Sequence, residues 1–73
     1  MKRTRFSGKK LRQIRMARYP LKEDGDVALA LGCRPDTYHN WERGASQPSA
    51  DWLPELCDYF NCGLIDFFDR YAT

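Results

Sequence analysis

The sequence predicts an all-α domain of five short helices, and three observations lead to this prediction. Apolar residues recur at helical spacing, as in Leu11/Ile14 and Leu64/Phe67, whereas the alternating pattern of a strand is scarce. Prolines and glycines stand where helices would begin and end. The chain has only 73 residues, so one small core between closely packed helices is expected.

Each expected helix has its own boundary signal. Ser7 is a suitable N-cap for the first helix, "KKLRQIRMARY", and Pro20 ends it. The second helix, "EDGDVALAL", opens on acids that suit a helix N-terminus, and Gly32 can close it in the left-handed conformation. The third helix runs from Pro35, a residue favoured at the first helical position, to Gly44. After the loop "ASQPS", two further helices are expected in "ADWLPELCDYF" and "LIDFFDRYA", separated by "NCG".

Charge is distributed unevenly along the chain. Residues 45–73 hold five acids and only one basic residue, Arg70. Residues 1–19 hold no acid and eight basic side chains: Lys2, Arg3, Arg5, Lys9, Lys10, Arg12, Arg15 and Arg18. We expect residues 1–7 to form a flexible basic arm and residues 8–73 a single domain. The basic end suits a polyanionic partner, and a solvated tail that only aids solubility is the alternative interpretation.

Composition argues against several classes of protein. No stretch approaches the roughly 20 apolar residues of a membrane span, and no apolar run follows the basic start, so a cytoplasmic protein is expected. Cys33, Cys57 and Cys62 form no Cys-x-x-Cys pair, and His39 is the only histidine; core cysteines are therefore expected, with no metal site. No nucleophile motif or phosphate-binding glycine loop is present, so we expect no enzyme, cofactor or small-molecule substrate.

The third expected helix has two different faces on a helical wheel. Tyr38 and Trp41 fall on one side, and we expect both to be buried because their exposure would forfeit a large hydrophobic stabilisation. The other side carries groups that donate and accept hydrogen bonds: Asp36, His39, Asn40 and Arg43. Such a face suits a helix placed in the major groove of DNA, although solvated surface has the same composition.

Two charged residues fall near the apolar sides of their helices. Arg15 lies beside Leu11 and Ile14 on the first helix, and Glu42 lies beside Tyr38 on the third. A charge at the edge of a core needs a partner. We therefore predict that Arg15 and Glu42 form an ion pair that joins the two helices.

The spacing of Ala28, Gly32 and Trp41 suits two helices that cross steeply over a tight turn, with a small residue at the close approach. Together with "LRQIR", "VALALG", "NWERG" and "PSADWLPELCDYFNC", this spacing resembles the lambda-repressor/Cro-type (XRE-like) helix-turn-helix family. The resemblance extends from about Gly8 to Phe68. It implies a five-helix domain that binds operator DNA, usually as a two-fold dimer, and regulates transcription. A small phage or bacterial repressor is the function expected from it.

The resemblance also implies roles for individual residues. Base reading falls to the start and outer face of the third helix: Arg34, Pro35, Asp36, His39 and Asn40. Contacts to the DNA backbone are expected from Arg43 and from the start of the second helix, Lys22 and Asp24. Apart from the resemblance, the positive charge of the arm leads us to expect that Lys2, Arg3 and Arg5 follow the DNA backbone or the minor groove. The helical wheel and the spacing at the turn, apart from the resemblance, predict structural roles for Arg15, Glu42, Ala28, Gly32, Tyr38 and Trp41.

Some residues depart from the family pattern. Asp24, Asp26 and Asp36 place negative charge near the expected DNA surface, and Pro35 removes a hydrogen-bonding side chain from a reading position. A protein-interaction module, such as an antitoxin or adaptor with the same fold, is therefore the alternative function. The C-terminal aromatic residues either complete the core or, in a C-terminal helix, form a homodimer interface.

Overall fold

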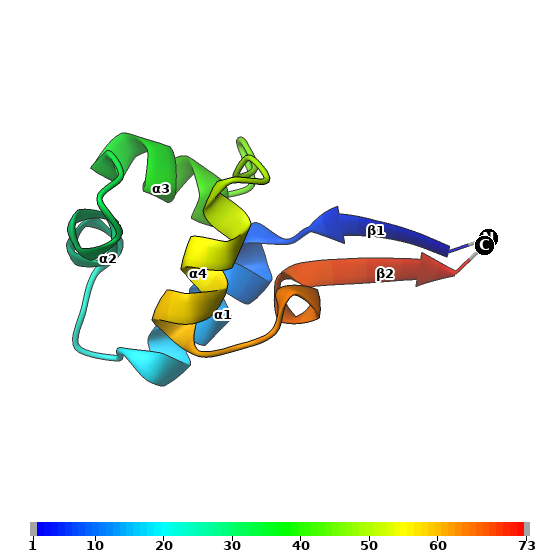
Figure 1. Cartoon of the computed structure of the whole chain (residues 1–73), viewed down its shortest axis with the longest axis horizontal. Helices are drawn as coiled ribbons and strands as arrows, with labels where there is room; N and C mark the ends of the chain where they lie inside the picture. The colour runs from blue at the N-terminus through cyan, green and yellow to red at the C-terminus, as the bar shows by residue number, and fades with distance from the viewer. Residues whose placement is uncertain (1, 73) are drawn as a thin grey trace.

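The computed structural model describes the backbone of residues 2–72 and the side chains of residues 5–69. Within this range the chain forms four α-helices, a short 3-10 helix and a two-stranded antiparallel sheet (Figure 1). In chain order the elements are β1 (Lys2–Phe6), α1 (Gly8–Arg18), α2 (Asp24–Leu31), α3 (Pro35–Glu42), α4 (Trp52–Phe60), η1 (Leu64–Phe67) and β2 (Phe68–Ala72).

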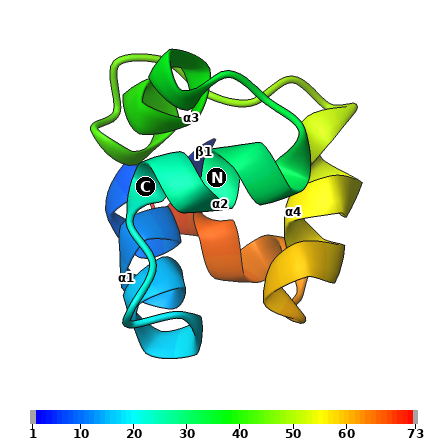
Figure 2. The ribbon, with the colours of Figure 1, turned by 90° about the vertical axis from the view of Figure 1, so that its left-hand side faces the viewer.

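The mostly helical fold agrees with the prediction, and the first four helices lie where the boundary signals place them. Helix α3 packs on α1 and α2, and α4 contacts the same two helices; in Figure 2, α1 and α4 stand on opposite sides of α2, with α3 above them. The two strands form a ribbon that extends away from the helices, so the chain is 38 Å long and about half as wide (Figure 1). None of the described helices has the length and hydropathy needed to cross a membrane.

The predicted helix boundaries are confirmed by their hydrogen bonds. The hydroxyl of Ser7 accepts from the backbone N–H of Lys10 at 3.2 Å and so caps α1. Pro35 occupies the first turn of α3. Gly32 ends α2 with φ of 84°, a left-handed conformation that favours glycine, and its N–H donates to the carbonyl of Ala28.

The core lies between the four helices and η1. Its buried members are apolar and aromatic: Leu11, Val27, Ala28, Tyr38, Trp41, Leu56, Phe60 and Phe67. Cys33, Cys57 and Cys62 are half-buried and pack against this core. Burial raises the pKa of all three thiols, so they remain protonated and behave as small apolar side chains.

The prediction of a fifth helix in "LIDFFDRYA" is wrong. The segment forms the 3-10 helix η1 and then strand β2. The carboxylate of Asp66 accepts from the N–H of Gly63 at 3.0 Å, which stabilises the single short turn. Beyond it, Phe68 pairs with Phe6 in the antiparallel register, so pairing with β1 replaces further helical hydrogen bonds.

The flexible arm expected at residues 1–7 is also replaced by regular structure. Lys2–Phe6 form strand β1, and their backbone pairs with Phe68–Ala72. The base of this ribbon is anchored by aromatic contacts, since the Phe6 ring lies 6.2 Å from Phe67 and 5.8 Å from Phe68. The backbone N–H of Ser7 donates to the carbonyl of Phe67 at 2.7 Å, which joins the ribbon to the start of α1.

Candidate nucleic-acid interface

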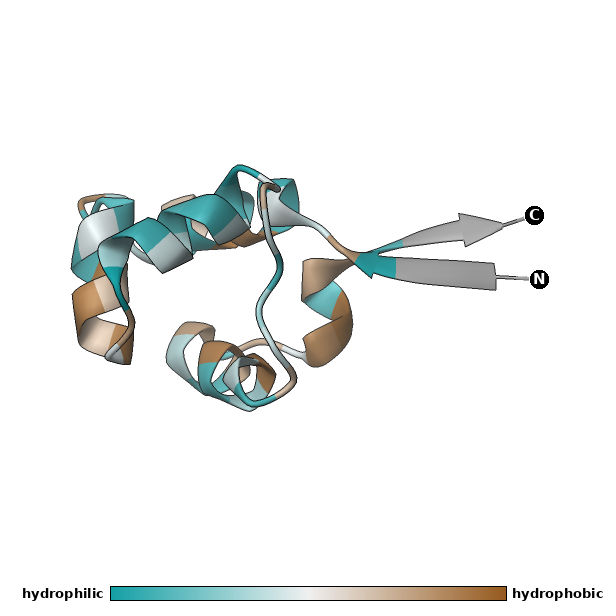
Figure 3. Cartoon of the chain, turned by 90° about the horizontal axis from the view of Figure 1, so that it is seen from above, coloured by the Kyte–Doolittle hydropathy of each residue, from teal (hydrophilic) through white to brown (hydrophobic). Residues whose placement is uncertain are grey.

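The outer face of α3 is open to solvent. Arg34, Pro35, Asp36, His39 and Arg43 are exposed, and Asn40 is half-buried. Figure 3 looks down on this side of the molecule and shows a largely hydrophilic ribbon along α3. The six side chains expected to read bases or hold a phosphate therefore share one accessible side of one helix.

Aromatic packing fixes α3 from behind. Tyr38 is fully buried and Trp41 is 3% exposed, as predicted. The ring centroids of these residues are 5.8 Å apart, and Trp41 also lies 5.6 Å from Trp52 of α4. Because large rings fill the space beneath the helix, its outer face is held in one orientation.

The ion pair predicted between Arg15 and Glu42 is confirmed, and it holds α3 against α1. Arg15 Nε donates to Glu42 Oε2 at 2.7 Å, and Nη2 donates to Oε1 at 3.0 Å. The Arg15 Nη1 group donates to the backbone carbonyl of Lys22 at 2.8 Å. The hydrogen bond with Glu42 raises the pKa of Arg15, so this guanidinium stays charged at every accessible pH.

A second side-chain contact, between a histidine and an aspartate, joins α2 to α3 on the exposed side. His39 Nδ1 lies 2.6 Å from Asp24 Oδ2, with 57% of the histidine side chain and 32% of the aspartate side chain exposed. The hydrogen bond with His39, with help from the backbone N–H of Gly25, lowers the pKa of Asp24. His39 and Asp24, for which the sequence analysis expects separate DNA contacts, thus form one hydrogen-bonded unit.

Charged side chains from three helices surround this unit. Together they line one shallow depression, which we call the charged depression. Its residues are Arg12 and Arg15 of α1, Glu23 and Asp24 near the start of α2, and His39, Glu42 and Arg43 near the end of α3. Arg12 was missed by the sequence analysis, although its position three residues before Arg15 places both on one side of α1. Its exposed side chain adds positive charge beside Arg43.

The start of α2 is less suited to a phosphate than the resemblance implies. The Asp26 carboxylate accepts from the backbone N–H of Glu23 at 3.1 Å, so the helix supplies its own anion there. Asp24 adds another carboxylate in the same turn. Like charges repel, so a phosphate near this helix end needs the basic groups of the charged depression.

The remaining residues expected at the DNA backbone lie elsewhere. The Lys22 ammonium lies 5.4 Å from the centre of the Tyr19 ring, a cation–π contact that directs it toward its own loop. Arg5 is exposed and lines a small depression with the loop after α3, residues 44–47. The backbone of Lys2 and Arg3 belongs to β1, and their side chains lie outside the described part of the chain.

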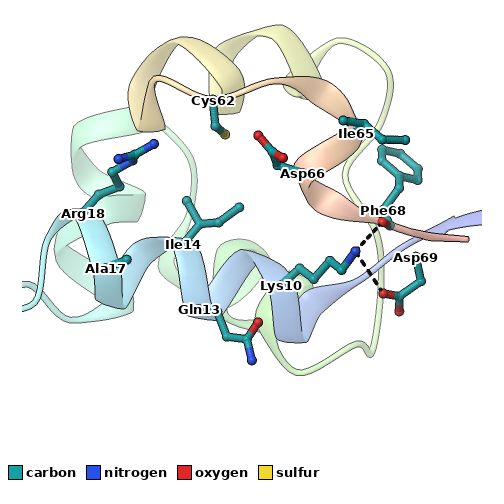
Figure 4. A pocket seen from close by; sticks show the side chains of 10 residues that line it. All are labelled: Lys10, Gln13, Ile14, Ala17, Arg18, Cys62, Ile65, Asp66, Phe68 and Asp69. Atoms are coloured by element: carbon teal, nitrogen blue, oxygen red, sulfur yellow. Dashed lines mark hydrogen bonds and ion pairs between the residues drawn. The ribbon is translucent and has the colours of Figure 1, made fainter.

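A larger groove lies on the other side of α1, at the base of the ribbon (Figure 4). Its charged groups are engaged in internal contacts: Lys10 Nζ donates to the Phe68 carbonyl at 2.8 Å, and Arg18 Nε donates to the Phe60 carbonyl at 3.0 Å. Lys10 also lies 3.4 Å from Asp69. Among the described side chains, no cluster of three or more His, Cys, Asp or Glu residues is placed to hold a metal ion.

Comparison of the chain with models of protein families, with curated proteins and with solved structures gave no match.

Proposed function

We propose that this chain is a sequence-specific DNA-binding regulator, a small phage or bacterial repressor of the helix-turn-helix type. In this proposal α2 and α3 form the helix-turn-helix, and α3 enters the major groove of operator DNA. The observation that carries the proposal is the open polar face of α3, fixed from behind by Tyr38 and Trp41. The wide major groove admits an α-helix, and base edges there are read by such hydrogen-bonding groups.

Further support comes from the turn between the two helices and from charge. Only Gly32, Cys33 and Arg34 separate α2 from α3, and the two helices pack directly on each other. Arg12 and Arg43 add exposed positive charge on the α3 side. Phosphate contacts by such residues supply most of the affinity for DNA, and base contacts supply the sequence preference.

The proposal is tested by binding to random duplex DNA across a series of salt concentrations. Each phosphate contact contributes about −0.9 to the slope of log K against log salt, so affinity is expected to fall steeply. Selection of bound sites from a random pool then gives the operator. A palindromic result would also report two-fold symmetry and the spacing of its half-sites.

Substitutions at Asn40 and Arg43 are expected to have different signatures. Asn40→Ala removes a group suited to paired hydrogen bonds with adenine, so binding to the selected operator should weaken by about 1–3 kcal/mol and sequence preference should relax. Arg43→Ala removes a phosphate contact, so it should weaken binding to all sequences alike and reduce the salt slope by about 0.9.

Gln13→Ala is the matched control, because Gln13 is exposed and lines the groove on the other side of α1. Titrations of selected and random duplexes at several salt concentrations separate the two signatures. Equal losses on both duplexes for Asn40→Ala would remove this residue from base reading.

Dimerisation is part of the proposal, although the C-terminal helix expected to mediate it is absent from the structure. The apolar surface at this end includes Leu64 and Ile65, whose side chains are about half exposed. We propose a homodimer that brings two copies of α3 to successive major grooves. Sedimentation that gives one copy per operator at saturation would contradict it.

The alternative function, a protein-interaction module such as an antitoxin or adaptor, is favoured by one feature. Carboxylates surround the start of α2 and α3: Glu23, Asp24, Asp26 and Asp36. An adaptor with this surface would hardly bind duplex DNA even at low salt, so the salt series distinguishes it from the repressor.

A further inference from the structure

The contact between His39 and Asp24 determines what the imidazole presents to a partner. A carboxylate accepts hydrogen bonds and an imidazole nitrogen either donates or accepts. Since the two side-chain atoms are 2.6 Å apart, the proton between them belongs on His39 Nδ1. In the neutral ring the other nitrogen, Nε2, is then left without a proton and is an acceptor.

The surroundings support a carboxylate at this place. The pKa of Asp24 is lowered by its hydrogen bond with His39 and by the N–H of Gly25, so the group is ionised over the physiological range. Asp24 stands in the first turn of α2, where the helix dipole favours a negative charge. Other charged groups face the pair from α1, from α2 and from α3: Arg12, Arg15, Glu23, Glu42 and Arg43.

The outer edge of the ring is accessible. More than half of the His39 side chain is exposed, while Nδ1 on the inner edge is occupied by Asp24. One ring carbon separates Nε2 from Nδ1, and His39 lies on the same side of α3 as Asp36, Asn40 and Arg43. The contact of Asp24 with Nδ1 thus leaves Nε2 as the one ring nitrogen of His39 that is free to meet a partner.

We propose that Asp24 is a positioning residue that sets the specificity of His39: it holds the neutral imidazole as the Nδ1–H tautomer, so that Nε2 accepts a hydrogen bond from a base. This inference rests on the proposed DNA-binding function. Acceptors facing the major groove recognise amino groups, which adenine and cytosine present there. A ring with its proton on Nε2 would instead be a donor, so it would no longer require an amino group and would bind guanine or thymine, whose groove edges offer acceptors and no amino group.

The first measurement needs no DNA. Nitrogen-15 chemical shifts of the His39 ring, recorded at alkaline pH, report the tautomer. We expect Nδ1–H in the native chain and a shift toward Nε2–H in Asp24→Ala. Asp36→Ala, which removes another exposed acid on the same side of the molecule, is the control and should leave the tautomer unchanged. The inference is overturned if the native His39 ring is in the Nε2–H form, or if Asp24→Ala leaves its tautomer unchanged.

The second measurement is site selection from a random duplex pool at the same pH. The base pair that His39 contacts is identified as the position of the selected operator, a column of the aligned sites, at which base preference is lost in His39→Ala. We expect adenine or cytosine in that column for the native chain. In Asp24→Ala the preference should move toward guanine or thymine by at least about fivefold, the lower end of the effect of one mismatched base pair.

The two measurements distinguish two kinds of failure. If the tautomer depends on Asp24 and His39→Ala changes one column, but Asp24→Ala leaves that column unaltered, the specificity role is overturned and DNA binding stands. If the tautomer depends on Asp24 but the chain selects no DNA sequence, the proposed function is overturned, and with it the proposed role of His39 in base recognition.

Discussion

Replacing Gly8 with alanine is expected to lower the free energy of unfolding by about 3 kcal/mol, the upper part of the usual range for overpacked sites. A Cβ at this position would lie 2.6 Å from the carbonyl oxygen of Glu42 and closer still to that of Trp41. Both atoms belong to the backbone at the end of α3, so no side chain can rotate away. The start of α1 and the end of α3 would have to separate.

A loss of this size is a large share of the stability of a small domain. At the usual 0.05–0.15 kcal/mol per residue, a chain of 73 residues has a free energy of unfolding of about 4–11 kcal/mol. The midpoint of thermal unfolding would then fall by about 12–24 °C. Urea denaturation gives the change in free energy directly.

Gly25→Ala provides the matched control. Gly25 lies in α2, and a Cβ there would meet no atom within 4 Å. Because alanine has the higher helix propensity, this substitution should leave stability unchanged or raise it by up to about 1 kcal/mol. The same chemical change is therefore expected to have opposite signs at the two positions. Similar small effects at both would contradict the close approach of α1 and α3.

The approach at Gly8 has an electrostatic consequence as well. The N-terminal end of α1 carries partial positive charge, and the carbonyls at the C-terminal end of α3 carry partial negative charge. Only a residue without a side chain allows these two ends to meet so closely. Gly8 thus helps to fix the position of α3, whose outer face carries the proposed function.

The features that sequence predicted correctly depend on local signals. Ser7, Gly32 and Pro35 mark helix ends because each forms or replaces hydrogen bonds within a few residues of itself. The pair Arg15–Glu42 joins two helices, yet it was predictable because each charge falls beside apolar neighbours on its own helix. A buried charge requires a partner, and these were the two placed to satisfy each other.

The features that sequence missed depend on the meeting of distant segments. Pairing of β1 with β2 joins the two ends of the chain, and the helical spacing of Leu64 and Phe67 favoured a helix instead. The contact of Asp24 with His39 could not be read from a helical wheel. A wheel shows which side of one helix a residue occupies but not which residue of the next helix lies opposite. The close approach at Gly8 is likewise invisible until the two helices are placed together.

Removal of Glu42 is expected to cost about 3 kcal/mol of stability, because a guanidinium that stays largely buried loses its acceptors. The side chains of Arg15 and Glu42 are only 13% and 6% exposed. In Glu42→Ala, Nε and Nη2 of Arg15 lose both carboxylate oxygens, and the bond from Nη1 to Lys22 is the one that remains of the three. Little water can reach these groups to replace the carboxylate.

The exposed pair Lys10–Asp69 provides a control of the same chemistry. Its atoms lie 3.4 Å apart and its side chains are 41% and 39% exposed. Asp69→Ala should therefore cost less than about 1 kcal/mol, as is usual for surface ion pairs. Comparable costs for Glu42→Ala and Asp69→Ala in urea denaturation would show that burial does not strengthen the inner pair.

A double substitution separates the attraction within the pair from the penalty of an unpaired charge. Arg15→Met with Glu42→Leu removes both charges and keeps apolar volume beside Tyr38, so most of the stability lost in Glu42→Ala should return. Recovery would mean that most of the loss in Glu42→Ala comes from the unpaired charge of Arg15, and that the pair itself adds little net stability over apolar side chains. If the double variant is instead as unstable as Glu42→Ala, the hydrogen bonds of Arg15 themselves stabilise the fold, including its bond to Lys22 in the loop before α2.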